Sequence, residues 1–155
     1  MKRYKDVPDF FRENAEKDNK TEAEILAQKA NQAISGLKEQ YLEQTKADVR
    51  IMKELLLKAQ KAKQQERFKF IREDFFIKVH DMKGQGSTFG YPLLTEIGAY
   101  ACDFLRYKQE ITDADLTVLK QIVKDAETVL KEDLMVTGGQ IGADIREHLE
   151  KKDTP

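Results

Sequence analysis

The chain has 155 residues, enough for one domain that buries a core without crosslinks. Its 27 lysines and arginines nearly balance 28 aspartates and glutamates, so a formal net charge of −1 gives no electrostatic reason to expect nucleic acid or an anionic membrane as partner. The single cysteine, Cys102, excludes an internal disulfide and fits a reducing compartment. The first residues lead into no apolar segment, and no run approaches the roughly 20 apolar residues of a membrane span. We therefore expect no signal peptide and a cytoplasmic location.

The N-terminal part of the sequence predicts a polar arm followed by helix. Residues 1–20 are mostly polar, and we expect them to form the arm. Thr21 and Glu24 fit a capping box, in which hydroxyl and carboxylate accept hydrogen bonds from the free amides of a helix start. Apolar residues then recur at helical spacing as far as Tyr41, with a break or bend expected at Gly36 because an interior glycine costs about 1 kcal/mol relative to alanine. A second helical stretch follows, with Met52, Leu55, Leu56 and Ala59 on one side.

The next helix is expected from about residue 65 to about residue 88. Gly90 should stop it, and Pro92 should start another, because proline is tolerated at the first helical position and not inside. Apolar residues at steps of three or four mark both helices. They are Phe68, Ile71, Phe75, Val79, Met82, Gly86 and Phe89 in the first, and Leu93, Leu94, Ile97, Ala101, Phe104 and Leu105 in the second.

The last third of the sequence predicts one long and one short helix. The segment from Thr112 to Asp115 resembles an N-terminal cap, and Gly138 and Gly139 should end the long helix that follows. Its apolar seam is Leu116, Leu119, Val123, Ala126, Leu130 and Leu134, and the short helix carries Ile141, Ile145 and Leu149. No segment shows period-two alternation, so an all-α fold is predicted, with long amphipathic helices packed as an antiparallel bundle.

His80 stands out on the helix expected from about residue 65. On a helical wheel it lies about 100° from the core residue Val79, on the flank of the apolar stripe, and should face solvent. Lys83 and Gly84 lie one turn ahead on the same flank, and Phe76 lies one turn behind. We therefore expect Phe76 to be part of a docking surface around the ring.

The residues after His80 favour a charged group on the imidazole. Gly84 and Gly86 together cost roughly 2 kcal/mol of helix propensity, and a helix that needed only packing has little reason to carry both. Gly84 removes a side chain beside the ring and opens room for a partner. The Lys83 ammonium can reach a group attached to the ring, and a phosphoryl group, with close to two negative charges, suits it. A free imidazole has a pKa of about 6.5, so its neutral form can attack an acyl phosphate at neutral pH.

The segment from His80 to Gly90 resembles the signature of histidine-containing phosphotransfer (HPt) domains. That signature has a histidine followed by lysine at +3, glycine at +4 and glycine at +10, which here are His80, Lys83, Gly84 and Gly90. The ending Gly-Ser-Thr-Phe-Gly is also similar to the phosphorylated domain of chemotaxis histidine kinases. The resemblance implies an antiparallel up-down four-helix bundle with an additional N-terminal helix and a short C-terminal helix. One domain would then cover residues 21–150, with its bundle core at about 37–135 and a tail at 151–155.

The resemblance also implies a function in two-component phosphorelays. His80 would accept a phosphoryl group from a receiver-domain aspartate or a histidine kinase and pass it to another receiver domain. Lys83 would stabilise the phosphoryl charge, while Gly84, Phe76 and Ser87 would belong to the docking surface. Such carriers are not enzymes with their own nucleotide site, need no cofactor because the receiver supplies magnesium, and are usually monomers.

Several alternatives stay open beside this interpretation. The same bundle could be a non-catalytic module that binds a receiver domain or another signalling partner, or the phosphoacceptor part of a larger chemotaxis-type kinase. A metal site is not expected, since His80, Asp81 and Cys102 lack ligand spacing, and Cys102 is interpreted as a core residue. Asp81 is expected to be a solvated charge. His148 is not expected to carry a phosphoryl group, because no glycine follows it at the offsets found after His80. Whether Asp81, Gln85 or Thr88 assists His80 is left open.

Overall fold

A computed structural model describes residues 21–135 and 138–153, and over these ranges the chain is helical with no strand. The predicted all-α class is confirmed for this part of the chain. The chain divides into two compact units, residues 1–40 and residues 41–155. The predicted arm over 1–20 lies outside the described residues, and the predicted domain limits stay predictions.

Helix α2 (Glu22–Lys61) passes through both units. Its start is the predicted capping box, with the Glu24 amide donating to Thr21 Oγ1 and the Thr21 amide donating to the Glu24 carboxylate, each at 3.2 Å. The expected break at Gly36 is wrong, because the helix continues through this residue. One interior glycine costs only about 1 kcal/mol, which a helix of 40 residues tolerates.

The second unit continues with three joined helical segments where one helix was predicted over about 65–88. They are α3 (Gln64–Phe68), the π-helical segment η2 (Lys69–Phe75) and α4 (Phe76–Gln85). A 3₁₀ turn, η3 (Ser87–Phe89), follows. The predicted apolar stripe does face the core, since Ile71, Phe75, Val79, Met82 and Gly86 are buried.

Helix α5 (Pro92–Arg106) begins where the sequence predicts. Gly90 adopts a left-handed φ of +91°, which favours glycine, and Pro92 occupies the first turn of α5. Helix α6 (Asp113–Lys131) begins at the predicted cap, with a capping box between Thr112 and Asp115.

The predicted end of α6 at Gly138 and Gly139 is wrong, because the helix ends at Lys131. Asp133 takes a positive φ of 51° just after it, and its carboxylate accepts a hydrogen bond from the Tyr91 hydroxyl. This tertiary contact fixes the chain in a turn where local sequence alone favours more helix. Helix α7 (Gly139–Asp153) follows.

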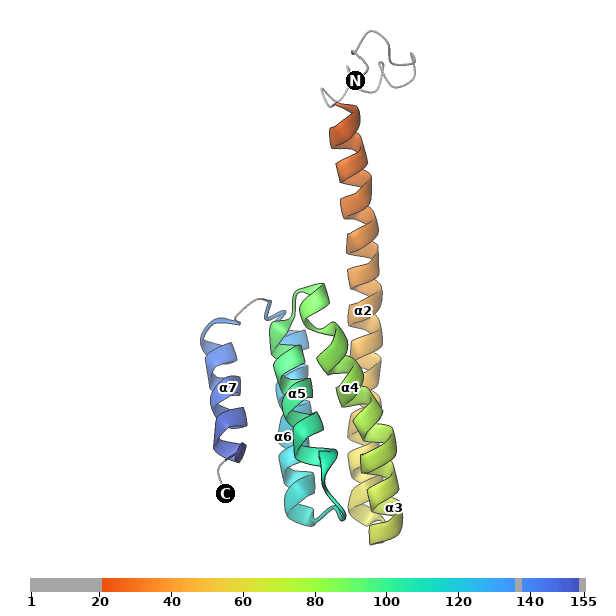
Figure 1. Cartoon of the computed structure of the whole chain (residues 1–155), viewed down its shortest axis with the longest axis vertical. Helices are drawn as coiled ribbons and strands as arrows, with labels where there is room; N and C mark the ends of the chain where they lie inside the picture. Colours follow the sequence, from red (N-terminus) through yellow and green to blue (C-terminus); the bar gives the residue numbers. More distant parts are fainter. Residues whose placement is uncertain (1–20, 136–137, 154–155) are drawn as a thin grey trace. The chain divides into compact units, whose positions relative to one another are not determined.

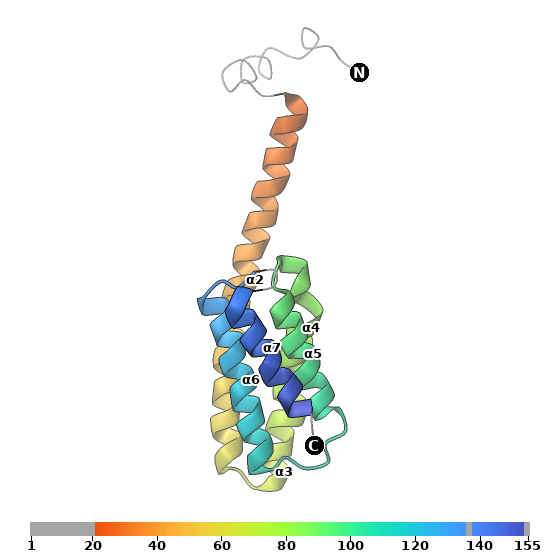
Figure 2. The same ribbon diagram turned by 90° about the vertical axis from the view of Figure 1, so that its left-hand side faces the viewer.

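Within the second unit the helices pack side by side around one core. Helix α5 contacts both α4 and α6, and α7 lies against α5 and α6 (Figures 1 and 2). The part of α2 from Tyr41 onward contributes buried side chains and forms ion pairs with α6 (Lys53–Glu127, 2.6 Å) and with α4 (Asp48–Lys78, 3.0 Å). Six predicted core residues lie nearer the surface. Ile141 is exposed, and the other five are half-buried: Phe68, Phe89, Phe104, Leu130 and Leu134.

Arg67 links the end of α2 to the segment that precedes α6. Its guanidinium donates to the carbonyl of Ala59 near the end of α2 (2.8 Å) and to the carbonyl of Ile111 before α6 (3.2 Å). The same group forms an ion pair with Asp113 at 2.9 Å. Because its side chain is only 12% exposed, this arginine holds the end of α2 and the segment before α6 together with charge-assisted hydrogen bonds that water screens little.

Candidate functional site

His80 projects from α4 into solvent, as the helical wheel predicts. Its neighbours Val79 and Met82 are buried in the core and fix the rotation of the helix about its axis. The imidazole is therefore held on a packed helix while its ring stays accessible to another molecule.

The ring of Phe76 lies beside the imidazole from the preceding turn, and Arg72 in turn contacts Phe76. The Phe76 and His80 rings lie 6.2 Å apart between centroids, tilted by 33°. The Arg72 guanidinium lies 4.9 Å from the centroid of the Phe76 ring and donates to the carbonyl of Arg106 at 2.8 Å. Arg72 thus connects the Phe76 side of α4 to the end of α5, a role that the sequence analysis missed.

Lys83 and Gly84 occupy the turn after His80, and both are exposed. A side chain built on Gly84 would meet nothing within 4 Å, so no packing within the described chain accounts for this glycine. The positive charges of Lys83 and Arg106 act on the thiol of Cys102 on α5 and favour its ionised form. Burial nevertheless raises the pKa of the Cys102 thiol, and the two cations only reduce this effect.

Gly98 lets helix α5 approach α4 closely beside His80. A Cβ on Gly98 would lie 2.5 Å from the Lys83 amide nitrogen and 2.7 Å from the Val79 carbonyl oxygen. The backbones of α4 and α5 therefore touch directly beneath the turn that carries His80. The sequence analysis passed over Gly98, although a glycine inside a helical pattern costs about 1 kcal/mol relative to alanine and can therefore mark a packing contact.

Gly86 has a packing role, which corrects the expectation that packing would not account for the two glycines. A Cβ on Gly86 would lie 2.7 Å from Thr95 Oγ1 and 2.8 Å from the Tyr91 carbonyl oxygen. Ser87, predicted as a docking residue, is exposed, but its amide and hydroxyl both contact Thr95 Oγ1, at 2.7 and 3.0 Å. Both residues therefore shape the end of α4, and of the two glycines Gly84 and Gly86, Gly84 is the one without a packing contact.

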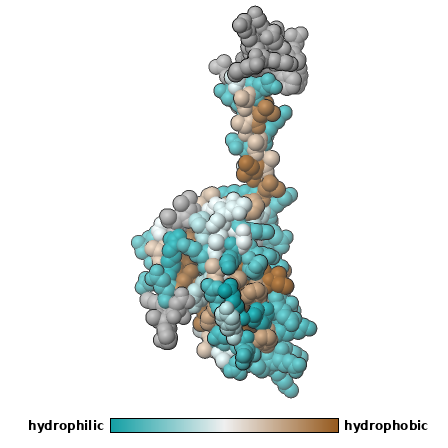
Figure 3. Space-filling model, in the orientation of Figure 1, coloured by the Kyte–Doolittle hydropathy of each residue, from teal (hydrophilic) through white to brown (hydrophobic). Residues whose placement is uncertain are grey.

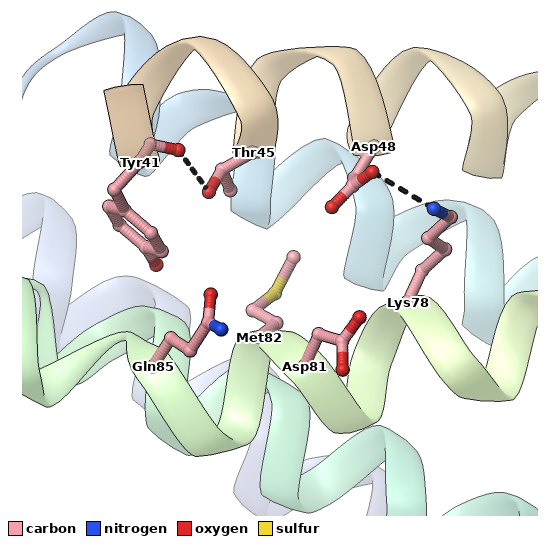
Figure 4. Close-up of a pocket in the computed structure, with 7 residues that line it drawn as sticks. All are labelled: Tyr41, Thr45, Asp48, Lys78, Asp81, Met82 and Gln85. Atoms are coloured by element: carbon pink, nitrogen blue, oxygen red, sulfur yellow. Dashed lines mark hydrogen bonds and ion pairs between the residues drawn. The ribbon is translucent and has the colours of Figure 1, made fainter. Parts of the chain in front are cut away.

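Asp81 and Gln85 lie on a different flank of α4, where they line a small cavity between α4 and α2 (Figure 4). The other lining residues are Tyr41, Thr45, Asp48, Lys78 and Met82. Lys78 is bound to Asp48 there, and the Thr45 hydroxyl donates to the Tyr41 carbonyl at 2.7 Å. Burial raises the pKa of the Tyr41 phenol. The structure thus groups Asp81 and Gln85 with α2, and not with the imidazole of His80.

The second histidine belongs to a separate contact. His148 Nδ1 on α7 lies 3.4 Å from the carboxylate of Asp125, which is buried on α6. Thr88 is exposed. Within residues 21–135 and 138–153, no group of three or more histidine, cysteine, aspartate or glutamate side chains is arranged to hold a metal ion.

Comparison with known proteins identifies no relative of this chain. No family model matches the chain, and no curated protein or solved structure matches it either. None of the described helices combines the length and the apolar character that crossing a membrane requires. The function must therefore be argued from the residues around His80.

Proposed function

We propose that this protein is a histidine phosphotransfer carrier that is phosphorylated on His80. One observation carries the proposal: an exposed imidazole, an exposed lysine one turn on and an uncovered Gly84 share one stretch of α4. A packed helix holds the nucleophile, the cation offsets phosphoryl charge, and the glycine leaves space for a partner.

The proposed architecture is the up-down four-helix bundle of HPt domains. Its four helices would be α2 from Tyr41 onward, the continuous α3–η2–α4 run, α5 and α6. The first part of α2 and helix α7 would be additions to this bundle. The proposal is supported by the shared core and by the pairwise contacts of α4 with α5 and of α5 with α6.

The proposed reaction transfers a phosphoryl group from an aspartyl phosphate of a receiver domain. A neutral ring nitrogen of His80 attacks phosphorus, a nitrogen–phosphorus bond forms, and the bond between phosphorus and the aspartyl oxygen breaks. The aspartate leaves as carboxylate, and the excess ring proton passes to solvent. Lys83 stabilises the phosphoryl oxygens throughout, and transfer to a second receiver reverses these steps. Receiver domains would supply magnesium, and a cytoplasmic location is part of this proposal.

The docking surface for the receiver would centre on Phe76, His80 and Gly84. Phe76 is half-buried against the core and offers a fixed apolar face beside the ring. Ile77 adds an apolar side chain that is 55% exposed. Ser87 would contribute less than the sequence suggests, because Thr95 already binds its hydroxyl.

Incubation with a phosphorylated receiver domain tests the proposal. We expect acid-labile phosphate on the wild-type protein and on His148→Gln, which keeps His80, and none on His80→Gln. Lys83→Gln should be labelled more slowly. Absence of label on the wild type, or equal labelling of His80→Gln, would refute the carrier function; receiver binding without label would instead support a non-catalytic interaction module.

A further inference from the structure

The first part of α2 carries an apolar stripe that the described residues leave uncovered. In this stripe Leu26 is 61% exposed, Ile34 is 62% exposed and Leu37 is 56% exposed. Hydrophobic surface is visible along this part of α2 in Figure 3. With Ala27, Ala30 and Ala33, these side chains recur every three or four residues and so share one helix face. We call these six residues the apolar stripe.

The apolar stripe continues a face that is packed farther along the same helix. Tyr41, Thr45, Val49 and Met52 follow it at the same helical spacing and are buried in the second unit. A solvent-exposed helix has no need to extend such a pattern, since single exposed apolar residues are common but a continuous stripe indicates a partner. The stripe therefore has the character of an interface.

The sequence of the stripe is complementary to itself. If a second helix runs antiparallel with the two-fold axis at Ala30, Leu26 faces Ile34 of the other copy, and Ala27 faces Ala33. The same alignment places Ala23 opposite Leu37, so each residue of the apolar stripe faces an apolar residue of the other copy. In an interface with two-fold symmetry, residue i of one copy contacts residue j of the other, and residue j contacts residue i. A segment whose apolar residues are arranged symmetrically about Ala30 can therefore pair with itself.

The acidic first turn of α2 also favours antiparallel pairing. Glu22 and Glu24 both lie in this turn. Antiparallel pairing about Ala30 sets the first turns of the two copies at opposite ends of the contact. Parallel pairing would place their carboxylates side by side, and this repulsion costs free energy.

We propose that residues 22–40 bind a second copy of this chain as an antiparallel helix pair centred on Ala30. This interface goes beyond the proposed phosphotransfer and does not involve His80. It replaces the expectation of a monomer that the HPt resemblance implies. Small residues at Ala27, Ala30 and Ala33 let the two helices approach closely, and the larger side chains close both ends of the contact.

Crosslinking of the full-length protein tests the register. In a Cys102→Ala background, a short bis-maleimide reagent should link Ala30→Cys to itself within the dimer. Ser35→Cys, exposed on the opposite side of the helix, is the matched control and should link at least tenfold less. A mixture of Leu26→Cys and Ile34→Cys should give more crosslinked dimer than either variant alone. Equal crosslinking of Ala30→Cys and Ser35→Cys would overturn the proposal.

Sedimentation equilibrium tests the association itself. The apparent mass of the wild type should rise with concentration from 17.9 kDa toward twice that value. The triple variant Leu26→Gln, Ile34→Gln, Leu37→Gln should have at least a tenfold higher dissociation constant, whereas Leu57→Gln, exposed outside the stripe, should behave as wild type. Phosphate labelling of His80 in the triple variant should be unchanged, which separates this proposal from the proposed function. A wild type that stays at 17.9 kDa at every concentration, whatever else covers the stripe, would overturn the proposal.

Discussion

Replacing Gly98 with alanine should destabilise the protein by forcing α4 and α5 apart. The new Cβ would lie 2.5 Å from the Lys83 amide nitrogen and 2.7 Å from the Val79 carbonyl oxygen. Both atoms belong to the backbone of α4, so neither can move aside as a flexible side chain would. The added methyl group therefore has to be accommodated by displacing one helix from the other.

The magnitude follows from two opposing terms. Overpacking a well-packed interior costs about 1–3 kcal/mol, and a contact with two backbone atoms places Gly98→Ala at the upper end, at about 3 kcal/mol. Alanine is a better helix former than glycine and returns about 1 kcal/mol. The net loss should be about 2 kcal/mol in the free energy of unfolding. For a chain of this size that corresponds to a fall in Tm of about 4–8 °C.

Urea unfolding followed by circular dichroism measures this loss, with Gly84→Ala as the matched control. The same substitution on α4 meets nothing within 4 Å and should stabilise the protein by up to about 1 kcal/mol through helix propensity. The two alanine variants should therefore differ by about 3 kcal/mol. If Gly98→Ala instead proves as stable as Gly84→Ala, the close approach of the two helices beneath His80 is wrong.

Three further variants test the exposure of His80, the capping box of α6 and the hydrogen bonds of Arg67. His80→Gln should leave the free energy of unfolding within about 0.5 kcal/mol of wild type, because the ring is exposed. A much larger loss in thermal melts would mean that the imidazole packs in the core. Burial alone would raise the pKa of Asp115, but hydrogen bonds from the Thr112 amide and the Lys108 ammonium lower this pKa overall. The ionised carboxylate therefore stabilises the folded protein fully above the usual aspartate pKa of about 3.9. This stabilisation is lost as the pH falls through the lower pKa of the native state. Asp115→Asn should therefore cost about 1 kcal/mol at neutral pH and lose less stability than wild type on acidification, and equal urea midpoint shifts in the two proteins would contradict this. Arg67→Lys should cost about 2 kcal/mol in urea unfolding, since one ammonium cannot serve both the Ala59 carbonyl of α2 and the Ile111 carbonyl before α6. An unchanged midpoint would show that these contacts contribute little.

Features set by neighbours in the sequence could be predicted. The capping boxes at Thr21 and Thr112, the proline at the start of α5 and the helix stop before Gly90 all depend on residues within one helical turn. The exposure of His80 also follows from its phase relative to Val79 on a single helix. Such local rules are independent of how the helices later pack.

Features set by contacts between helices could not be predicted. The length of α6 was overestimated because the turn at Asp133 is fixed by Tyr91, 42 residues earlier in the chain. Gly86 and Gly84 look alike in the sequence, yet only Gly86 is packed against Thr95. The exposure of Leu26, Ile34 and Leu37 could not be predicted either, because these residues have the same helical spacing as the buried residues farther along α2.

The amino-acid order alone determined that the chain is helical and which face of α4 bears the imidazole, because both depend on periodicity and on hydrogen bonds within a turn. Tertiary structure decided how close α5 comes to that imidazole, which glycine is left open, and where α6 stops. Those outcomes depend on steric fit between atoms far apart in the chain, and no spacing rule contains that information.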